Sequence, residues 1–190
     1  MAIPTDELQK TNPSAKIELF EIHLVSAIHG SSDIKRFFNG YGDNSFNNLV
    51  FQSQSYTAIP IEANGFKYAA TRTTLPRPTV RISNLDSTIS ALMTQANVVT
   101  PKNDLNSAKF IRKVTLMRYL DNENFAGNTN PFGTPSNTTY DEEIYFIDRK
   151  TVESKMFVEF ELALNLDLQN RKAPKRIITR NDFPSVGTFV

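Results

Sequence analysis

The residues of this chain that could carry chemistry are few. His23 and His29 are its only histidines, and their separation of six residues does not match a metal-ligand spacing. We expect His23 on a strand face and His29 in an exposed loop. The sequence contains no cysteine, which excludes disulfides, thiolate metal sites and a cysteine nucleophile within these residues.

Two carboxylate pairs have the residue types of a glycoside hydrolase. Glu159 and Glu161 alternate along a predicted strand, so both would point to its outward face, and Glu142 with Glu143 stands at the end of a polar loop. A solvated surface explains both pairs. The sequence has no nucleophile elbow, phosphate-binding loop or dinucleotide fingerprint. We therefore predict no catalytic, cofactor-binding or metal-binding residue.

Composition narrows the function classes. At 190 residues the chain is one sizeable domain or two small ones, and chains of this length typically bury about 70% of their unfolded surface. Lysine and arginine total 21 and aspartate and glutamate 20, so the net charge is +1. A balance this close to zero argues against a nucleic-acid-binding protein and favours self-association.

The start of the chain, MAIPTDELQK, lacks the basic and apolar segments of a secretory signal. No apolar run approaches the roughly 20 residues of a membrane span. We expect a soluble protein, made in a reducing cytoplasm and without a membrane partner.

Alternating apolar residues predict a mostly β domain. The clearest alternation places Val158, Phe160, Leu162, Leu164 and Leu166 on one face of an extended segment. Segment 25–48 reads as a loop or loose hairpin, and 121–143 as a long polar loop. Strands are expected at 16–24, 49–64, 65–74, 79–83, 109–120 and within 144–166.

One substantial helix is predicted at 84–99, near 85–99 in its regular part, and a short amphipathic helix at 3–11. Asn84 or Ser87 can cap the longer helix. Its apolar face has helical spacing and comprises Leu85, Ile89, Leu92, Met93 and Ala96.

The sequence LPRPTVRISNL at 75–85 has a restrained backbone. Pro76 and Pro78 each fix φ and remove a backbone donor, and each pushes the preceding residue toward extended geometry. Two interpretations stay open: a rigid entry into the strand at 79–83, or a strand edge held in place for assembly. Under the second, Pro76, Arg77 and Pro78 are candidate assembly contacts.

A basic cluster, NRKAPKRIITR, lies at 170–180. Nucleic-acid contact would call for interleaved aromatic residues, which the cluster lacks. We favour a basic arm that pairs with acidic surface on a neighbouring subunit. We divide the chain into a β-rich domain at 1–170 and an extended arm at 171–190. The arm's candidate contacts are Arg171, Lys172, Lys175 and Arg176.

The stretch at 56–85 resembles the minor tail protein L family of long, flexible-tailed bacteriophages. The family's pattern has an aromatic residue, a P-I pair, a G-F pair and then R-P-T-x-x-x-S-N-L. The segments 16–24, 112–125 and the last predicted strands are also similar to it. The matching residues are Tyr56, Pro60, Ile61, Gly65, Phe66, Arg77, Pro78, Thr79, Ser83, Asn84 and Leu85.

The resemblance implies a non-enzymatic structural protein of the virion tail tip. It implies a ring, a homo-oligomer and most simply a trimer, between the distal tail ring protein of the tube and the central hub that recognises the host. The fold implied is mainly β (α+β), a β-sandwich or barrel of tail-tube or hub type with one main helix and long arms. Family members typically continue into a cysteine-rich domain that holds an iron–sulfur cluster. This sequence has no cysteine, so we expect no cofactor and carry over no ligands.

Two other classes stay open. A carbohydrate-binding β module that contacts the host surface would need a row of exposed aromatic residues, and Phe37, Phe38, Tyr41 and Phe46 are the candidates. A cell-wall hydrolase would use Glu142 or Glu159 as its acid.

Overall fold

Most of the chain is described by the computed structural model: residues 7, 9–40, 48–66, 75–139, 141–168, 179 and 184. This part of the chain is mainly β, and its nine strands form a single mixed sheet. The strands are β1 (Lys16–His23), β2 (Ile34–Asn39), β3 (Asn48–Phe51), β4 (Gln54–Ile59), β5 (Ile61–Asn64), β6 (Thr79–Ser83), β7 (Lys109–Leu116), β8 (Asp141–Glu153) and β9 (Phe157–Ala163). The α-helices are α2 (Ser26–His29), α3 (Thr88–Val99) and α4 (Asn165–Leu168), and the 3₁₀ turns are η1 (Met117–Tyr119), η2 (Asn122–Asn124) and η3 (Ala126–Asn128).

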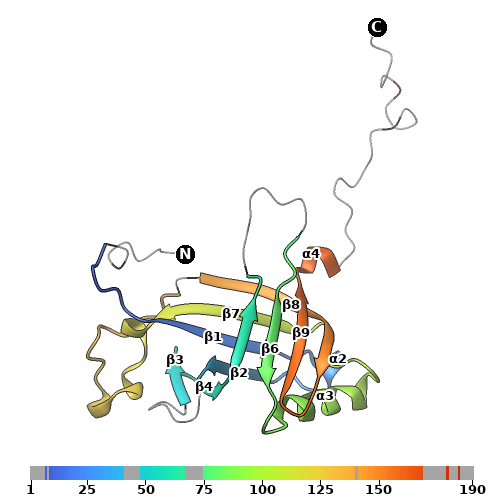
Figure 1. Cartoon of the computed structure of the whole chain (residues 1–190), viewed down its shortest axis with the longest axis horizontal. Coiled ribbons are helices and arrows are strands. Elements are labelled where there is room, and N and C mark those ends of the chain that lie inside the picture. Colours follow the sequence, from blue (N-terminus) through green and yellow to red (C-terminus); the bar gives the residue numbers. More distant parts are fainter. Residues whose placement is uncertain are drawn as a thin grey trace.

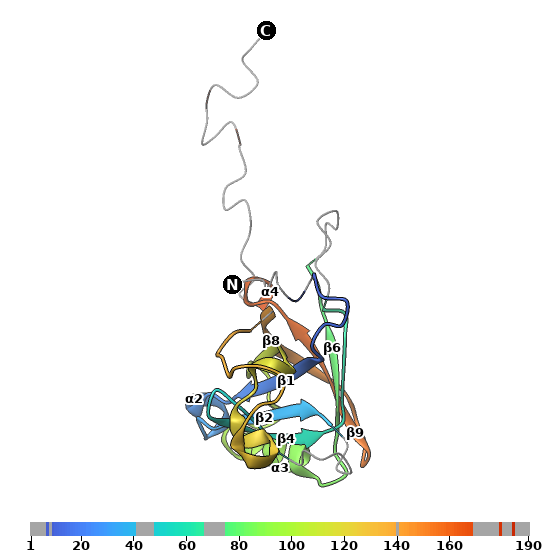
Figure 2. The ribbon, with the colours of Figure 1, turned by 90° about the vertical axis from the view of Figure 1, so that its left-hand side faces the viewer.

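The strand order is β3-β4-β2-β1-β7-β8-β9-β6-β5, and β2–β4 is the parallel pair. A single residue, Pro60, separates β4 from β5, although these strands stand near opposite ends of that order. The Ile61 amide donates to Asn39 Oδ1 at the end of β2 (3.3 Å). The chain bends at Pro60, the sheet curls back toward its own start (Figures 1 and 2), and the segment expected to be a strand at 49–64 forms three strands, β3, β4 and β5.

The main core lies between the inner face of the curled sheet and α3 (Figure 1). Phe20, Phe110, Tyr145 and Phe160 are fully buried there, and alternate residues of β6 and β9 point the same way. The strand predicted at 79–83 is confirmed, with Val80 and Ile82 turned inward.

The helix prediction is correct for its core face and wrong at its start. Ile89, Leu92, Met93 and Ala96 are buried as expected. The helix begins at Thr88, because Ser87 has a left-handed backbone (φ 56) that the helix cannot include. Asn84–Asp86 therefore form a turn, and Leu85 is 73% exposed instead of joining the core.

A second core covers part of the outer face of the sheet. Leu19, Phe38 and Tyr56 belong to it, and the turn that follows β7 closes it with Leu120. Phe37 and Phe38 are neighbours on β2 and enter different cores. The strand expected at 16–24 is present as β1, and it is covered on both faces, because Leu19 enters this core while Phe20 and Ile22 enter the main one.

The described part of segment 25–48, residues 25–40 and 48, is more ordered than predicted. It contains α2 and β2. We attribute the formation of β2 to the burial of Phe37 in the main core and of Phe38 in the second core. His29 is fully buried, so the prediction of an exposed loop histidine is wrong. Its Nδ1 accepts from the Val25 amide (2.9 Å), and its Nε2 lies 3.0 Å from the Asn106 carbonyl oxygen. These partners satisfy both ring nitrogens without solvent.

The C-terminal strands form the hairpin β8–β9. Val158, Phe160 and Leu162 are buried, so their alternation is confirmed. The strand ends at Ala163, however, and α4 begins at Asn165, so the predicted strand face does not continue to Leu166. The polar loop predicted at 121–143 holds η2 and η3, and β8 begins at Asp141. Most of the segments predicted at 3–11 and 65–74 lie outside the described residues.

Candidate assembly surfaces

Arg77 lies at the centre of an ion-pair cluster on the outer face of the sheet. Its guanidinium contacts the carboxylates of Asp148 (3.0 Å), Glu161 (3.0 Å) and Asp167 (2.6 Å). Hydrogen bonds to Glu161 and Asp167 raise the pKa of Arg77 above its ordinary value. Bonds from Arg149 and then Arg77 lower the pKa of Glu161. The cluster joins the approach to β6 with β8, β9 and α4.

The prolines flanking Arg77 hold the backbone against the sheet. The Pro78 carbonyl oxygen accepts from the Leu162 amide (2.8 Å), so pairing with β9 begins before β6 itself. Gly65 has φ +85, and a Cβ there would lie 3.2 Å from Pro78 Cα. Glycine suits this position for both reasons.

The strand that follows Pro78 is not an edge strand. β6 pairs with β5 on one side and β9 on the other, and the ends of the sheet are β3 and β5. The prediction of a strand edge at 79–83 is therefore wrong, because β5 adds beside β6 after the Pro60 bend. Pro76, Arg77 and Pro78 remain predicted assembly contacts; Arg77 is exposed, Pro76 is half-buried and Pro78 is buried. The arm residues Arg171, Lys172, Lys175 and Arg176 lie outside the described residues.

At the β3 end the sheet edge is covered by a side chain. Asn124 Oδ1 accepts from the Val50 amide and Asn124 Nδ2 donates to the Val50 carbonyl oxygen, both at 2.6 Å. The Ser53 amide donates to Asp121 (2.7 Å). Asn124 thus takes the place of a neighbouring strand, which protects the edge from pairing with another chain.

A buried polar cluster lies beneath the covered half of the outer face. The Glu21 carboxylate accepts from Tyr56 Oη (2.6 Å) and Lys113 Nζ (2.8 Å) and contacts His23 Nε2 (2.8 Å), with Arg36 Nε at 3.8 Å. Burial alone would raise the pKa of Glu21, but the bonds from Lys113, Tyr56 and His23 outweigh it and lower the pKa to about 2. Burial and the bond to Glu21 raise the pKa of Tyr56 above its ordinary value. This cluster ties β1, β2, β4 and β7 together.

The carboxylates considered for hydrolysis do not form a pair of free acids. Glu143 is buried on β8 and binds Arg112 (2.8 Å), so its expected place in a loop is wrong. Glu159 binds Arg81 (2.8 Å) on the outer face, as its strand position predicted. Among the described residues, no group of three or more His, Cys, Asp or Glu side chains could hold a metal ion. Searched over the same residues, no helix has the length and hydropathy to span a bilayer.

The aromatic row proposed for carbohydrate binding is not present as predicted. Phe37 and Phe38 are 4% and 7% exposed, because each is a core residue of β2. Tyr41 and Phe46 lie outside the described residues.

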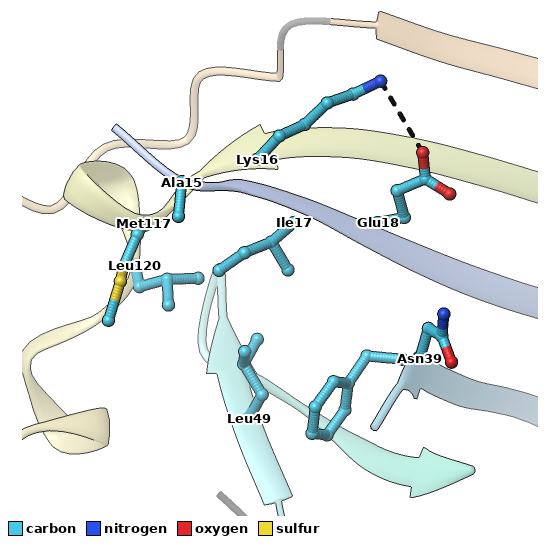
Figure 3. A pocket seen from close by; sticks show the side chains of 9 residues that line it. Ala15, Lys16, Ile17, Glu18, Asn39, Leu49, Met117 and Leu120 are labelled. Carbon is cyan, nitrogen blue, oxygen red and sulfur yellow. Dashed lines mark ion pairs between the residues drawn. The ribbon is translucent and has the colours of Figure 1, made fainter. Parts of the chain in front are cut away.

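Two of the open pockets on the described surface bear on the question of assembly. The first, of about 330 Å³, is shown in Figure 3: Ile17 of β1, Leu49 of β3 and Leu120 after η1 line one hollow, with the Lys16–Glu18 ion pair (3.6 Å) at its rim. The second, of about 520 Å³, lies where the β6–α3 turn meets the β8–β9 hairpin, and we call it the hairpin pocket. Its lining residues are Asn39, Pro60, Ile61, Glu62, Arg81, Ser83, Leu85, Met156 and Phe157.

Comparison with protein families gives one match across most of the chain. Residues 28–186 match the model of the family described as phage minor tail protein L. The matched range begins in α2 and includes the strands from β2 to β9, the Arg77 cluster and the hairpin pocket.

Proposed function

The chain belongs to the phage minor tail protein L family, and from that premise we propose that it forms a ring at the tip of the phage tail. Family membership makes it a structural component of the tail. The finer assignment, a ring that joins the distal tail tube to the central host-recognition hub, is our proposal. The observation that carries it is the family match over residues 28–186.

The surfaces of the chain support a role in assembly. Arg77 holds three carboxylates from β8, β9 and α4 in a fixed array, so a neighbouring protein would meet preorganised charges. The near-neutral net charge of +1 opposes self-association little. We propose a homo-oligomer, most simply a trimer, that uses this surface and the arm at 171–190 against its neighbours.

The other proposed partners are the distal tail ring protein on one side and the central hub on the other. We propose no role in nucleic-acid or membrane binding and no enzymatic activity. The residues present do not fit a cysteine-ligated iron–sulfur cluster, because the sequence has no cysteine. No step of the proposed function depends on one.

Locating the chain within the particle tests this function. We would fuse a small epitope to the chain, label purified particles with gold-conjugated antibody and image them by electron microscopy. Gold at the distal end of the tube, between tube and hub, is expected. Gold distributed along the tube, or confined to the head end of the tail, would contradict a tip ring.

A second measurement tests the joining role. Particles made without this chain should contain tubes that lack the hub, as detected by mass spectrometry of purified tails. Normal hub content in such tails would show that the chain does not join the two.

A further inference from the structure

Phe132 is an exposed aromatic residue on a turn that is held rigidly. Phe132 is 57% exposed, whereas Asn130, two residues earlier in the chain, is 6% exposed. The Asn130 amide nitrogen Nδ2 donates to the carbonyl oxygens of three residues at 3.0–3.3 Å: Met117, Arg118 and Leu120. Asn130 therefore fastens this turn to the end of β7 through backbone groups.

Two more hydrogen bonds fix the direction of the turn. The backbone amide of Asn130 donates to Asn122 Oδ1 (3.0 Å), and the backbone amide of Phe132 donates to Asn130 Oδ1 (2.9 Å). Gly133 packs so closely on Arg118 that a Cβ would lie 2.9 Å from Arg118 Cβ. A large apolar side chain on a preorganised turn loses little conformational entropy on binding, which is typical of an interface anchor.

The hairpin pocket, elsewhere on the same chain, has a mixed lining in which five of the nine residues are apolar. Leu85 and Met156, which line it, are 73% and 68% exposed, and Phe157 lies beside them. The turn that carries Leu85 and the turn that carries Met156 are joined to each other, because the Asn84 backbone amide donates to the Met156 carbonyl oxygen (2.9 Å). Figures 1 and 2 place these turns apart from the loop after β7, so one chain presents the anchor and the pocket on different parts of its surface.

The charges of the two surfaces are compatible. No charged residue occurs between Glu123 and Asp141, the segment that carries Phe132. In the pocket, Arg81 and Glu62 pair with each other (3.6 Å). Arg81 also pairs with Glu159 (2.8 Å), so a neutral loop would add no charge to a pocket whose cation is already paired, and interface centres are depleted in unpaired charge.

We infer that Phe132 of one copy binds in the hairpin pocket of a second copy of this chain. The anchor and the pocket are different surfaces, so the contact is head-to-tail, and such contacts close into rings when the rotation between copies permits. The inference rests on the proposed ring and names the contact that would build it.

Cysteine cross-linking provides a direct test, because the natural sequence has no cysteine to interfere. Full-length Phe132→Cys and Met156→Cys chains are mixed and oxidised with oxidised glutathione. We expect a cross-linked dimer between the two variants. Val98→Cys replaces Met156→Cys in the control, because Val98 is 80% exposed but lies on α3 outside the pocket. Cross-linking no stronger than in that control, or only between two Phe132→Cys chains, would overturn the inference.

Sedimentation measures the strength of the contact. Phe132→Ala and Leu85→Asn should each weaken self-association by at least about tenfold, the expected loss for an aromatic anchor or its pocket. Val98→Asn should leave it unchanged. A mixture of the Phe132→Ala and Leu85→Asn chains should form dimers but no larger species, since only one intact anchor–pocket pair remains. Full-strength association of Phe132→Ala, or a natural chain that stays monomeric at all concentrations, would contradict the contact.

Cross-linking in assembled tails distinguishes a failure of this inference from a failure of the proposed function. Tails that carry the Phe132→Cys, Met156→Cys chain should yield oligomers of this chain on oxidation. A cross-link from residue 132 to a different tail protein would overturn the inference while a tip location still stood. Absence of the chain from the tip would refute the proposed function, whatever the chain does in solution.

Discussion

The outer face of the sheet has two halves, which differ in whether their ion pairs are buried or partly exposed to solvent. Around β1, β2 and β4 it is covered by the loop after β7, and Glu21 is buried among Tyr56, Lys113 and Arg36. Around β6, β8 and β9 no cluster of the described residues covers it, and we call this the bare half; there Arg77, Arg81 and Arg149 form ion pairs that remain partly in solvent. Ion pairs therefore stabilise the fold strongly in one half and weakly in the other, because water screens only the second.

Removal of the Glu21 carboxylate should give the largest effect. Glu21→Ala leaves Lys113 and Arg36 without their anion beneath the covering loop, which should lower the free energy of unfolding by about 3–5 kcal/mol. Urea denaturation measures the loss. Glu159→Ala on the bare half is the matched control, and an equal loss in both variants would show that the two halves do not differ.

Acid should weaken the covered half through the same carboxylate. The pKa of Glu21 falls from 4.5 to about 2 on folding, so its contribution is fully present above pH 4.5 and is lost as the pH falls through about 2. The difference in unfolding free energy between natural chain and Glu21→Gln should therefore shrink between pH 4.5 and 2. Glu7, whose pKa is also lowered to about 2, is present in both chains, so its contribution to the pH dependence cancels in this difference. A difference that is constant over this range would refute the assignment.

The cover itself depends on Asn124. Asn124→Ala removes both bonds to the Val50 backbone and should cost about 1–2 kcal/mol of unfolding free energy. Light scattering should also detect aggregation through the freed β3 edge. Thr129→Ala, an exposed change in the same loop, should alter neither property.

The bare half should give the smallest change in stability. Arg77→Ala should lower the unfolding free energy by less than about 1 kcal/mol, and 1 M salt should reduce that difference further, because the Arg77 side chain is 44% exposed. Incorporation into tails should fall more than stability does if Arg77 contacts a neighbour. A loss of several kcal/mol would mean that the bare half holds the fold together as the covered half does.

Local patterns in the sequence predicted the elements that have one buried face. Val80 with Ile82, and Val158 with Phe160, follow the two-residue period of a strand that buries alternate residues. β2 was missed because Phe37 and Phe38 enter different cores, so it shows no such alternation. The start of α3 was misplaced because the left-handed backbone of Ser87 has no reliable signal in its residue type.

The candidate assembly surfaces were harder to predict from the sequence than the strands and helices. Arg77 was identified from its prolines, but its partners lie 71, 84 and 90 residues further along the chain, beyond any local pattern. The interior position of β6 likewise depends on β5, which reaches that side of the sheet through the Pro60 bend. Leu85 was assigned to a core and instead lines a surface pocket. Phe132 was not identified from the sequence, because its exposure on a rigid turn depends on the contacts of Asn130.

The pairing of β6 with β9 has a consequence for synthesis on the ribosome. Arg81 and its strand partner Glu159 are separated by 78 residues, so the β5–β6 hairpin leaves the ribosome long before the strand that completes it. Until β9 is translated, the edge of β6 on that side, which carries the apolar Val80 and Ile82, has no strand partner. Nascent chains halted before residue 157 should therefore bind chaperones that recognise apolar segments, and release should coincide with the emergence of β9.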